Sequence, residues 1–205
     1  MRFAFFAMVT MLSGVQVVSA NSTDANLEQI LSSVDQFAQK LGIDVPKPLS
    51  TNHVTSFGPY EGHEQTRSIL IQDRWQFVFD LNNHLIDTFC DREYSMAVLW
   101  KPAEIKPLIR PSAITKEEAL KMAREYLQRL GYLEMDLPVR PPEIHQWKWE
   151  PPGTESQPLP VFTIKWPSQK HPYWAYFTME IDGRRKMVTA FSTMYPLRDP
   201  PTPSR

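Results

Sequence analysis

The residues of this chain that could carry out chemistry are few and lie far apart in the sequence. His63 and Glu64 are adjacent, but they lie among glycine and proline residues typical of a loop, and the second histidine of a zinc peptidase helix is missing. Cys90 is the only cysteine, so no internal disulfide can form. The sequence also has no Gly-x-Ser-x-Gly elbow and no glycine-rich phosphate loop. We therefore expect no catalytic residues, no metal ligands and no cofactor.

Aromatic and basic residues in the second half are better candidates for a binding surface. Trp147 and Trp149 are spaced to lie on one face of a strand, and aromatic residues beside prolines can form peptide grooves. The alternative is that most of the aromatic residues belong to the core, and that the basic run 184–186 is a solvated turn. The candidate binding residues are Trp147, Trp149, Trp166, Tyr173, Trp174, Arg184 and Arg185.

Two similar helical segments are expected to support these residues. Residues 26–42 and 115–131 both place apolar side chains on one helical face. Thr115 and Glu118 form a Thr-x-x-Glu capping box, and Asn26 with Gln29 offers a weaker version of it. A glycine ends each segment, as is typical of helix termini. The chain therefore contains an internal repeat.

Each helical segment is followed by short segments with the alternating pattern of strands. Strands are expected at 53–57, 66–71, 74–81 and 85–90, and again at 144–149, 160–166, 173–181 and 187–192. Turns at 82–84 and 182–184 have the composition of turns with positive φ. The sequence therefore predicts an α+β fold of two repeated modules, each with one helix packed on its own antiparallel sheet of about four strands.

The N-terminus has the pattern of a secretory signal peptide. Met1-Arg2 precede an apolar stretch, and Val18-Ser19-Ala20 provides the small residues that a signal peptidase needs. We expect cleavage after Ala20, a secreted or periplasmic location and no integral membrane segment in the remaining chain. The expected organisation is a signal peptide at 1–20, a first module at 21–92, a proline-containing linker at 93–113, a second module at 114–195 and a proline-rich disordered tail at 196–205.

The charge of the chain argues against a polyanionic partner. It has 22 basic and 23 acidic side chains and a formal net charge of −1. Proteins that bind nucleic acid or anionic membranes usually carry a basic excess. A peptide or protein partner is therefore expected instead.

The second half of the chain resembles a PepSY domain. Residues 114–120 read Ile-Thr-Lys-Glu-Glu-Ala-Leu and lead into an amphipathic helix that ends at Gly131, and the hairpin around Asp182-Gly183 is similar to the closing hairpin of that family. The first half is similar only through the internal repeat. The resemblance implies an exported or envelope-associated module that binds proteins or modulates peptidases without catalytic residues of its own. The proline-rich insertion 151–160 departs from the family pattern.

A weaker resemblance links residues 76–80, Gln-Phe-Val-Phe-Asp, to the Gln-x-Val-x-Gly loop of cystatins. Asp80 replaces the glycine that lets this loop enter a protease cleft, so the strand interpretation is favoured. We therefore expect an exported, non-catalytic, tandem PepSY-like protein that binds a peptide or protein and modulates peptidases. The alternatives are a small secreted hydrolase that uses His63 and Glu64, and a purely structural envelope subunit.

The two halves differ in a way that favours the second as the binding half. Only the second half carries the insertion 151–160 and the cluster of tryptophans. Loops and aromatic residues added to a conserved scaffold commonly serve recognition. The first half would then mainly support the second.

Overall fold

The structure is a computed structural model, and it describes residues 23–60, 63–81, 86–95, 112–132, 141–150, 153, 155–167 and 175–193. The predicted signal peptide and tail lie outside these residues. So do the first of the two predicted turns, at 82–84, and most of the predicted linker.

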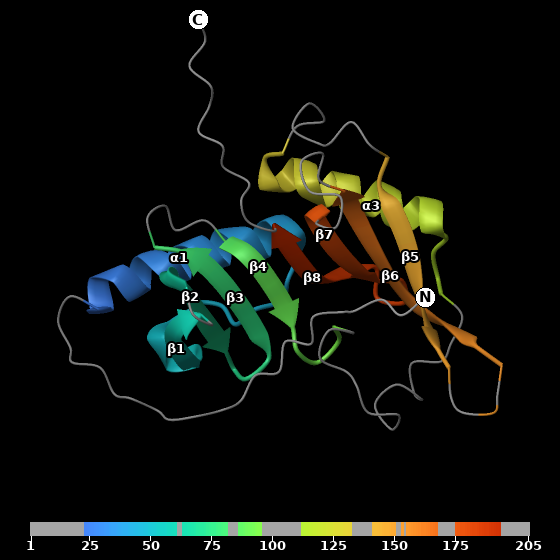
Figure 1. The fold of residues 1–205 in the computed structure, drawn as a ribbon. Helices are drawn as coiled ribbons and strands as arrows, with labels where there is room; N and C mark the ends of the chain where they lie inside the picture. The colour runs from blue at the N-terminus through green and yellow to red at the C-terminus, as the bar shows by residue number, and fades with distance from the viewer. Residues whose placement is uncertain are drawn as a thin grey trace, which may run out of the picture.

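The described residues form two α-helices, a short 3-10 turn and eight strands (Figure 1). In the first half these are α1 (Thr23–Leu41), the 3-10 turn η1 (Thr51–His53), β1 (Val54–Tyr60), β2 (His63–Ile71), β3 (Trp75–Asp80) and β4 (Ile86–Asp91). In the second half they are α3 (Lys116–Leu130), β5 (Glu143–Trp149), β6 (Gln157–Pro167), β7 (Ala175–Asp182) and β8 (Met187–Thr193). Every predicted strand has a counterpart close to its predicted position.

The strands form one continuous antiparallel sheet, so the expectation of two separate modules is wrong. The strand order is β1-β2-β3-β4-β8-β7-β6-β5, and β4 pairs with β8 in the middle. Phe89 of β4 lies opposite Phe191 of β8, and the Thr88 and Ser192 hydroxyls are 3.5 Å apart. The physical reason is that two small sheets would each leave an edge strand unpaired, whereas pairing β4 with β8 removes both inner edges.

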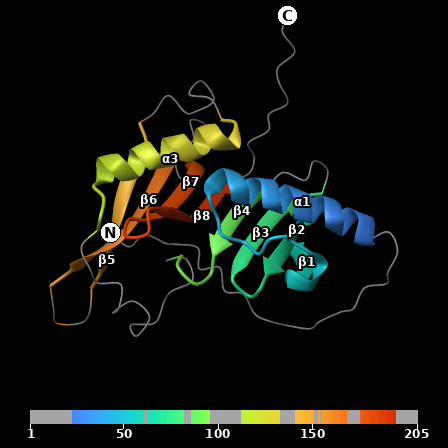
Figure 2. The same ribbon diagram turned by 180° about the vertical axis from the view of Figure 1, so that it is seen from behind.

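Both helices cover the same face of this sheet (Figure 2). α1 lies over the strands of the first half, α3 lies over those of the second half, and the two helices contact each other. Phe37 of α1 lies above the centre of the sheet, with its ring centroid 6.1 Å from that of Phe77, 6.2 Å from that of Phe89 and 5.9 Å from that of Phe191. A single hydrophobic core therefore continues across the β4–β8 join.

The ends of the helices agree with the sequence in three of four cases. Thr115 caps α3 by accepting a hydrogen bond from the Glu118 amide, and Glu118 accepts one from the Thr115 amide. Gly131 has φ 101° and Gly42 has φ 67°, the left-handed conformation expected of glycine at a C-terminus. The expected cap at Asn26 is wrong, because α1 begins at Thr23 and Asn26 lies inside it.

The start of the first sheet half also differs from expectation. His53 belongs to η1 instead of a strand, and its Nδ1 accepts a hydrogen bond of 3.1 Å from the Ser50 amide. The internal repeat, at an offset of 92 residues, matches His53 with His145, but His145 lies within β5. The two histidines therefore have different environments and do not form a pair.

The turn between β7 and β8 needs its glycine for space and not for positive φ. Gly183 does not have a positive φ, whereas Lys186 has φ 55°. The Gly183 amide donates to the Pro160 carbonyl at 2.7 Å, and its carbonyl accepts from the Ala113 amide at 3.2 Å. A Cβ at this position would overlap the Ser112 hydroxyl. The glycine thus lets the chain before α3 pack onto the turn.

Candidate binding surfaces

The far end of β5 and β6 forms a two-stranded extension of the sheet. β6 pairs with β7 only from Val161 onward, because β7 ends at Asp182 opposite that residue. Beyond this point Trp149 of β5 pairs with Gln157 of β6, and no other described strand is paired there. We call residues 147–149 and 157–160 the β5–β6 arm. Figure 1 shows the arm, in orange, projecting beyond the rest of the sheet.

The two tryptophans of the arm pack on a small apolar cluster of their own. Leu159 and Val161 are each 1% exposed, and the half-buried Trp147 and Trp149 pack against them. This cluster is separate from the main core. The Trp147 indole is also fixed by a 2.8 Å hydrogen bond from its Nε1 to the Thr163 hydroxyl. The arm therefore holds two large aromatic side chains at least partly in contact with solvent.

The backbone of β5 is also the more open of the two sheet edges. β1 and β5 are the end strands, and no described strand pairs with the outer side of either. β1 contains Gly58 and Pro59, and proline removes an N–H donor from the strand. β5 has the sequence Glu-Ile-His-Gln-Trp-Lys-Trp, without proline or glycine. The pairing of β5 with β6 is irregular between Gln146 and Lys148. An extended chain could therefore pair with the outer side of β5 before and after this irregularity without meeting a proline, which β1 would not allow.

Trp166, another of the predicted binding residues, belongs to the main core. It is 1% exposed and lies among the largest fully buried side chains of the described residues. Trp166 is therefore a core residue, as the alternative interpretation of the aromatic residues predicted. Tyr173 and Trp174 lie outside the described residues.

Arg184 and Arg185 hold the β7–β8 turn together. Both guanidinium groups bind the buried Asp182 carboxylate, at 3.3 Å and 2.8 Å. Burial by itself would raise the pKa of Asp182, but hydrogen bonds from the Arg184 amide and from both guanidinium groups lower it. The Arg185 guanidinium also lies 3.7 Å from the centroid of the Tyr94 ring. Both arginines are therefore engaged within the protein, where they share one carboxylate.

Tyr94 connects this turn to the other half of the sheet. The Arg74 guanidinium lies 4.8 Å from the Tyr94 ring centroid and binds the fully buried Asp91 at 2.9 Å. Arg74 also pairs with Glu93 at 3.0 Å. The beginning of the predicted linker is thus packed between the two halves. The apolar character of residues 96–100 predicts that this part of the linker docks on a module, and these residues lie outside the described part of the structure.

Cys90 lies on the sheet face that the helices do not cover. Burial raises the pKa of its thiol to about 12, and the nearby Glu180 and Asp91 carboxylates act in the same direction, although a hydrogen bond with Ser95 opposes them. The Thr189 hydroxyl donates to Glu180 at 2.7 Å on the same face. A thiol with so high a pKa stays protonated, so Cys90 is a poor nucleophile.

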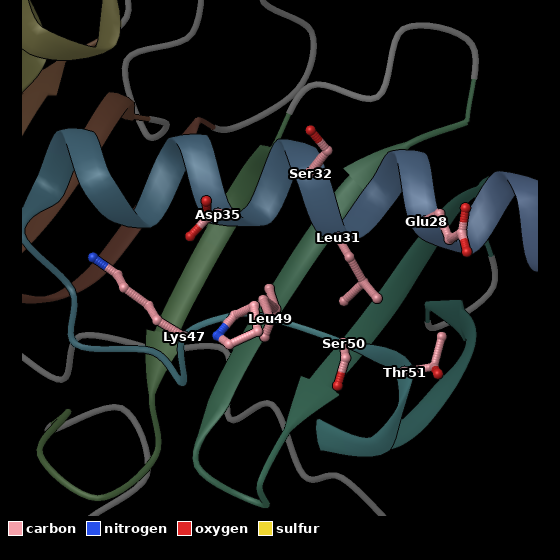
Figure 3. A pocket seen from close by; sticks show the side chains of 9 residues that line it. Glu28, Leu31, Ser32, Asp35, Lys47, Leu49, Ser50 and Thr51 are labelled. Atoms are coloured by element: carbon pink, nitrogen blue, oxygen red, sulfur yellow. The ribbon is translucent and has the colours of Figure 1, made fainter.

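A second surface feature is a groove between α1 and the chain that leads into η1 (Figure 3). Its volume is about 510 Å³. Helix α1 contributes Glu28, Leu31, Ser32 and Asp35, and the following segment contributes Lys47, Pro48, Leu49, Ser50 and Thr51. Figure 3 shows Leu31 and Leu49 in the middle, Glu28 and Thr51 toward one end, and Asp35 and Lys47 toward the other. The sequence analysis did not identify this groove, although the i, i+3 and i+7 spacing of Glu28, Leu31 and Asp35 places them on one helical face.

His63 and Glu64 are the first two residues of β2, and their side chains lie outside the described part of the structure. Among the described residues, no group of three or more His, Cys, Asp or Glu side chains could hold a metal ion. Within the same residues, no helix combines the length and the apolar character needed to cross a membrane.

Comparison with known proteins gives no relative to transfer a function from. No family model matches the chain, and neither a curated protein nor a solved structure matches it. The function must therefore be inferred from the surfaces themselves.

Proposed function

We propose that this chain is an exported, non-catalytic protein that binds an extended peptide segment of a partner along β5 and the β5–β6 arm. The observation that carries the proposal is the combination of an edge strand without proline or glycine and two half-buried tryptophans on one small apolar cluster. Peptides commonly bind proteins by adding a strand to an exposed sheet edge. Main-chain hydrogen bonds then supply affinity, and neighbouring side chains supply specificity.

The tryptophans fit the role of anchors in such a complex. Trp149 lies near the end of the arm, where β5 and β6 are the only described strands of the sheet, and Trp147 is held in place by Thr163. Partly exposed tryptophans that pack on buried apolar residues often contribute most of the energy of an interface. Because Trp147 is already oriented, little conformational entropy would be lost when a partner covers it.

The PepSY resemblance and the predicted signal peptide give the proposal its cellular setting. An exported member of a peptidase-modulating family would meet extended peptide segments of envelope or extracellular proteins. The partner in this proposal is therefore a peptidase or another secreted protein. The β7–β8 turn with Arg184, Arg185 and Asp182 is not part of the proposed surface, because both guanidinium groups are already bound by Asp182 within the protein.

The proposal is tested by selecting peptides from a displayed library on the full chain and measuring their affinity by calorimetry. Trp149→Ala should weaken binding by at least about fivefold, which corresponds to about 1 kcal/mol, without loss of the folded state. Lys148→Ala is the matched control, since Lys148 is an exposed neighbour on the opposite side of the strand. Equal affinity of the Trp149→Ala variant and the wild type would contradict the proposed site.

A second measurement separates this function from the hydrolase alternative. The selected peptides are incubated with the wild type and with variants of His63 and Glu64, and their masses are followed. Peptides that stay intact while bound support a binding function. Cleavage that depends on His63 and Glu64 would instead establish the enzyme.

A further inference from the structure

The groove between α1 and η1 has an apolar middle and two ends of different charge. Leu31, in the middle, is 5% exposed and belongs to the main core, and Leu49 packs against the same core. Figure 3 shows these two side chains between the charged ends. The volume of the groove, about 510 Å³, falls in the range of about 300–1,000 Å³ that is typical of small-molecule sites.

The charges around the groove are incompletely paired within the protein. Glu28 is exposed and forms no ion pair or hydrogen bond within the described residues. Asp35 accepts a hydrogen bond of 2.7 Å from the side-chain amide of Gln39. Because this donor is neutral, it does not compensate the negative charge of the Asp35 carboxylate. Lys47, on the same side of the groove as Asp35 in Figure 3, forms no ion pair with it. The lining therefore carries one unit of excess negative charge, concentrated at the Glu28 end.

We propose that this groove binds a small molecule that consists of an alkylammonium group on an apolar body. The apolar body would cover Leu31 and Leu49, and the ammonium group would lie between the Glu28 carboxylate and the Thr51 hydroxyl. This arrangement follows from charge complementarity, since a cation gains from Glu28 whereas an anion would be repelled by the two carboxylates that α1 contributes to the groove. The site is independent of the proposed peptide site, because it lies beside the strands of the first half and the β5–β6 arm lies at the opposite end of the sheet.

The test is an NMR titration of the full chain with n-octylamine, n-octanol and octanoate, three probes that share an apolar body and differ in charge. Octylamine should shift the backbone amides of Leu31, Leu49 and Thr51 in a saturable manner. It should bind more tightly than octanol, and octanol more tightly than octanoate. The preference for octylamine over octanol should weaken as the salt concentration rises, because salt screens the exposed Glu28 carboxylate.

Variants of the charged residues test the orientation of the ligand. Glu28→Gln should weaken octylamine binding by about two- to fivefold, the effect typical of an exposed ion pair. Glu125→Gln is the matched control, since Glu125 is an exposed acidic residue on α3 and not a lining residue of the groove. The control should bind octylamine as the wild type does.

Three results would overturn the proposal. The first is octanoate binding as tightly as octylamine. The second is an affinity for octylamine that is the same in Glu28→Gln and in the wild type. The third is a pattern of shifts that is not saturable or that is centred on another surface, such as the β5–β6 arm.

Discussion

Replacement of Trp166 by alanine should destabilise the protein strongly and should affect the peptide site only through the fold. Trp166 is 1% exposed, and a buried tryptophan removes roughly 150–250 Å² from water. At ~25 cal/mol per Å², this area corresponds to roughly 4–6 kcal/mol. Alanine keeps part of this burial and the surrounding core relaxes partly, so a loss of about 3–5 kcal/mol is expected. For a chain of this size, the melting temperature should fall by roughly 6–20 °C.

The measurement is thermal unfolding followed by circular dichroism and by calorimetry, with Trp149→Ala as the comparison. Trp149 is half-buried at the end of the arm, so its replacement should lower the melting temperature far less. A Trp166→Ala variant that melts like the wild type but no longer binds the selected peptides would refute this reasoning. It would show that Trp166 is an anchor of the interface and not a core residue.

Three further predictions concern Gly183, Cys90 and Asp182. Gly183→Ala should lower the free energy of unfolding, measured in urea, by about 1–3 kcal/mol, because the new Cβ overlaps the Ser112 hydroxyl. Gly58→Ala is the control and should change stability little, because nothing lies within 4 Å of its Cβ. Equal effects of the two substitutions would contradict the close packing at Gly183. Cys90 should resist iodoacetamide at pH 8 in the folded protein and react fully in urea, because burial raises the pKa of its thiol to about 12. Rapid alkylation of the folded chain would contradict the raised pKa. The folded-state pKa of Asp182 is lowered, so the stability that this carboxylate contributes is present above its unfolded pKa of about 3.9 and is lost as the pH falls through the folded value. Urea unfolding between pH 7 and pH 2 should therefore show a smaller acid loss for Asp182→Asn than for the wild type, and identical profiles would contradict the ion pairs.

The local structure of this chain could be predicted from its sequence because local patterns determine it. The alternation of Phe77 and Phe79 in β3 sets which side chains face the helices, and both lie in the core. The capping box of α3 depends only on Thr115 and Glu118, which are three residues apart. In each case the residues that interact are close in the sequence. Where a local signal was only partial, as at Asn26, the prediction was wrong.

The arrangement of the halves could not be predicted because it depends on one pairing between distant strands. Phe89 and Phe191 would be apolar in a separate module as well as in a continuous sheet, so their type does not distinguish the two folds. Gly183 shows the same difficulty, because the need for space at this turn comes from Ser112 on another segment. Contacts between residues that are far apart in the sequence are hard to infer from a single sequence.

The positions of the candidate binding residues in the fold could be predicted in part. The spacing of Trp147 and Trp149 correctly placed them on the same strand, and the structure places them on a separate apolar cluster. The sequence did not distinguish these side chains from Trp166, which has the same chemistry and a core position. The charges of Arg184 and Arg185 suggested a free basic turn, because their partner Asp182 was read as a turn residue only.

The join between β4 and β8 has a consequence for how the protein forms. The hydroxyl pair across it connects residues 104 positions apart, whereas all other strand pairings of the sheet lie within one half. During synthesis, β4 is complete long before β8 leaves the ribosome, and closing so long a loop carries a large entropic cost. The outer edge of β4 therefore stays unpaired in a nascent chain, with Phe89 beside it. An edge of this kind can pair with other chains, so the nascent protein is open to aggregation for as long as β8 is missing.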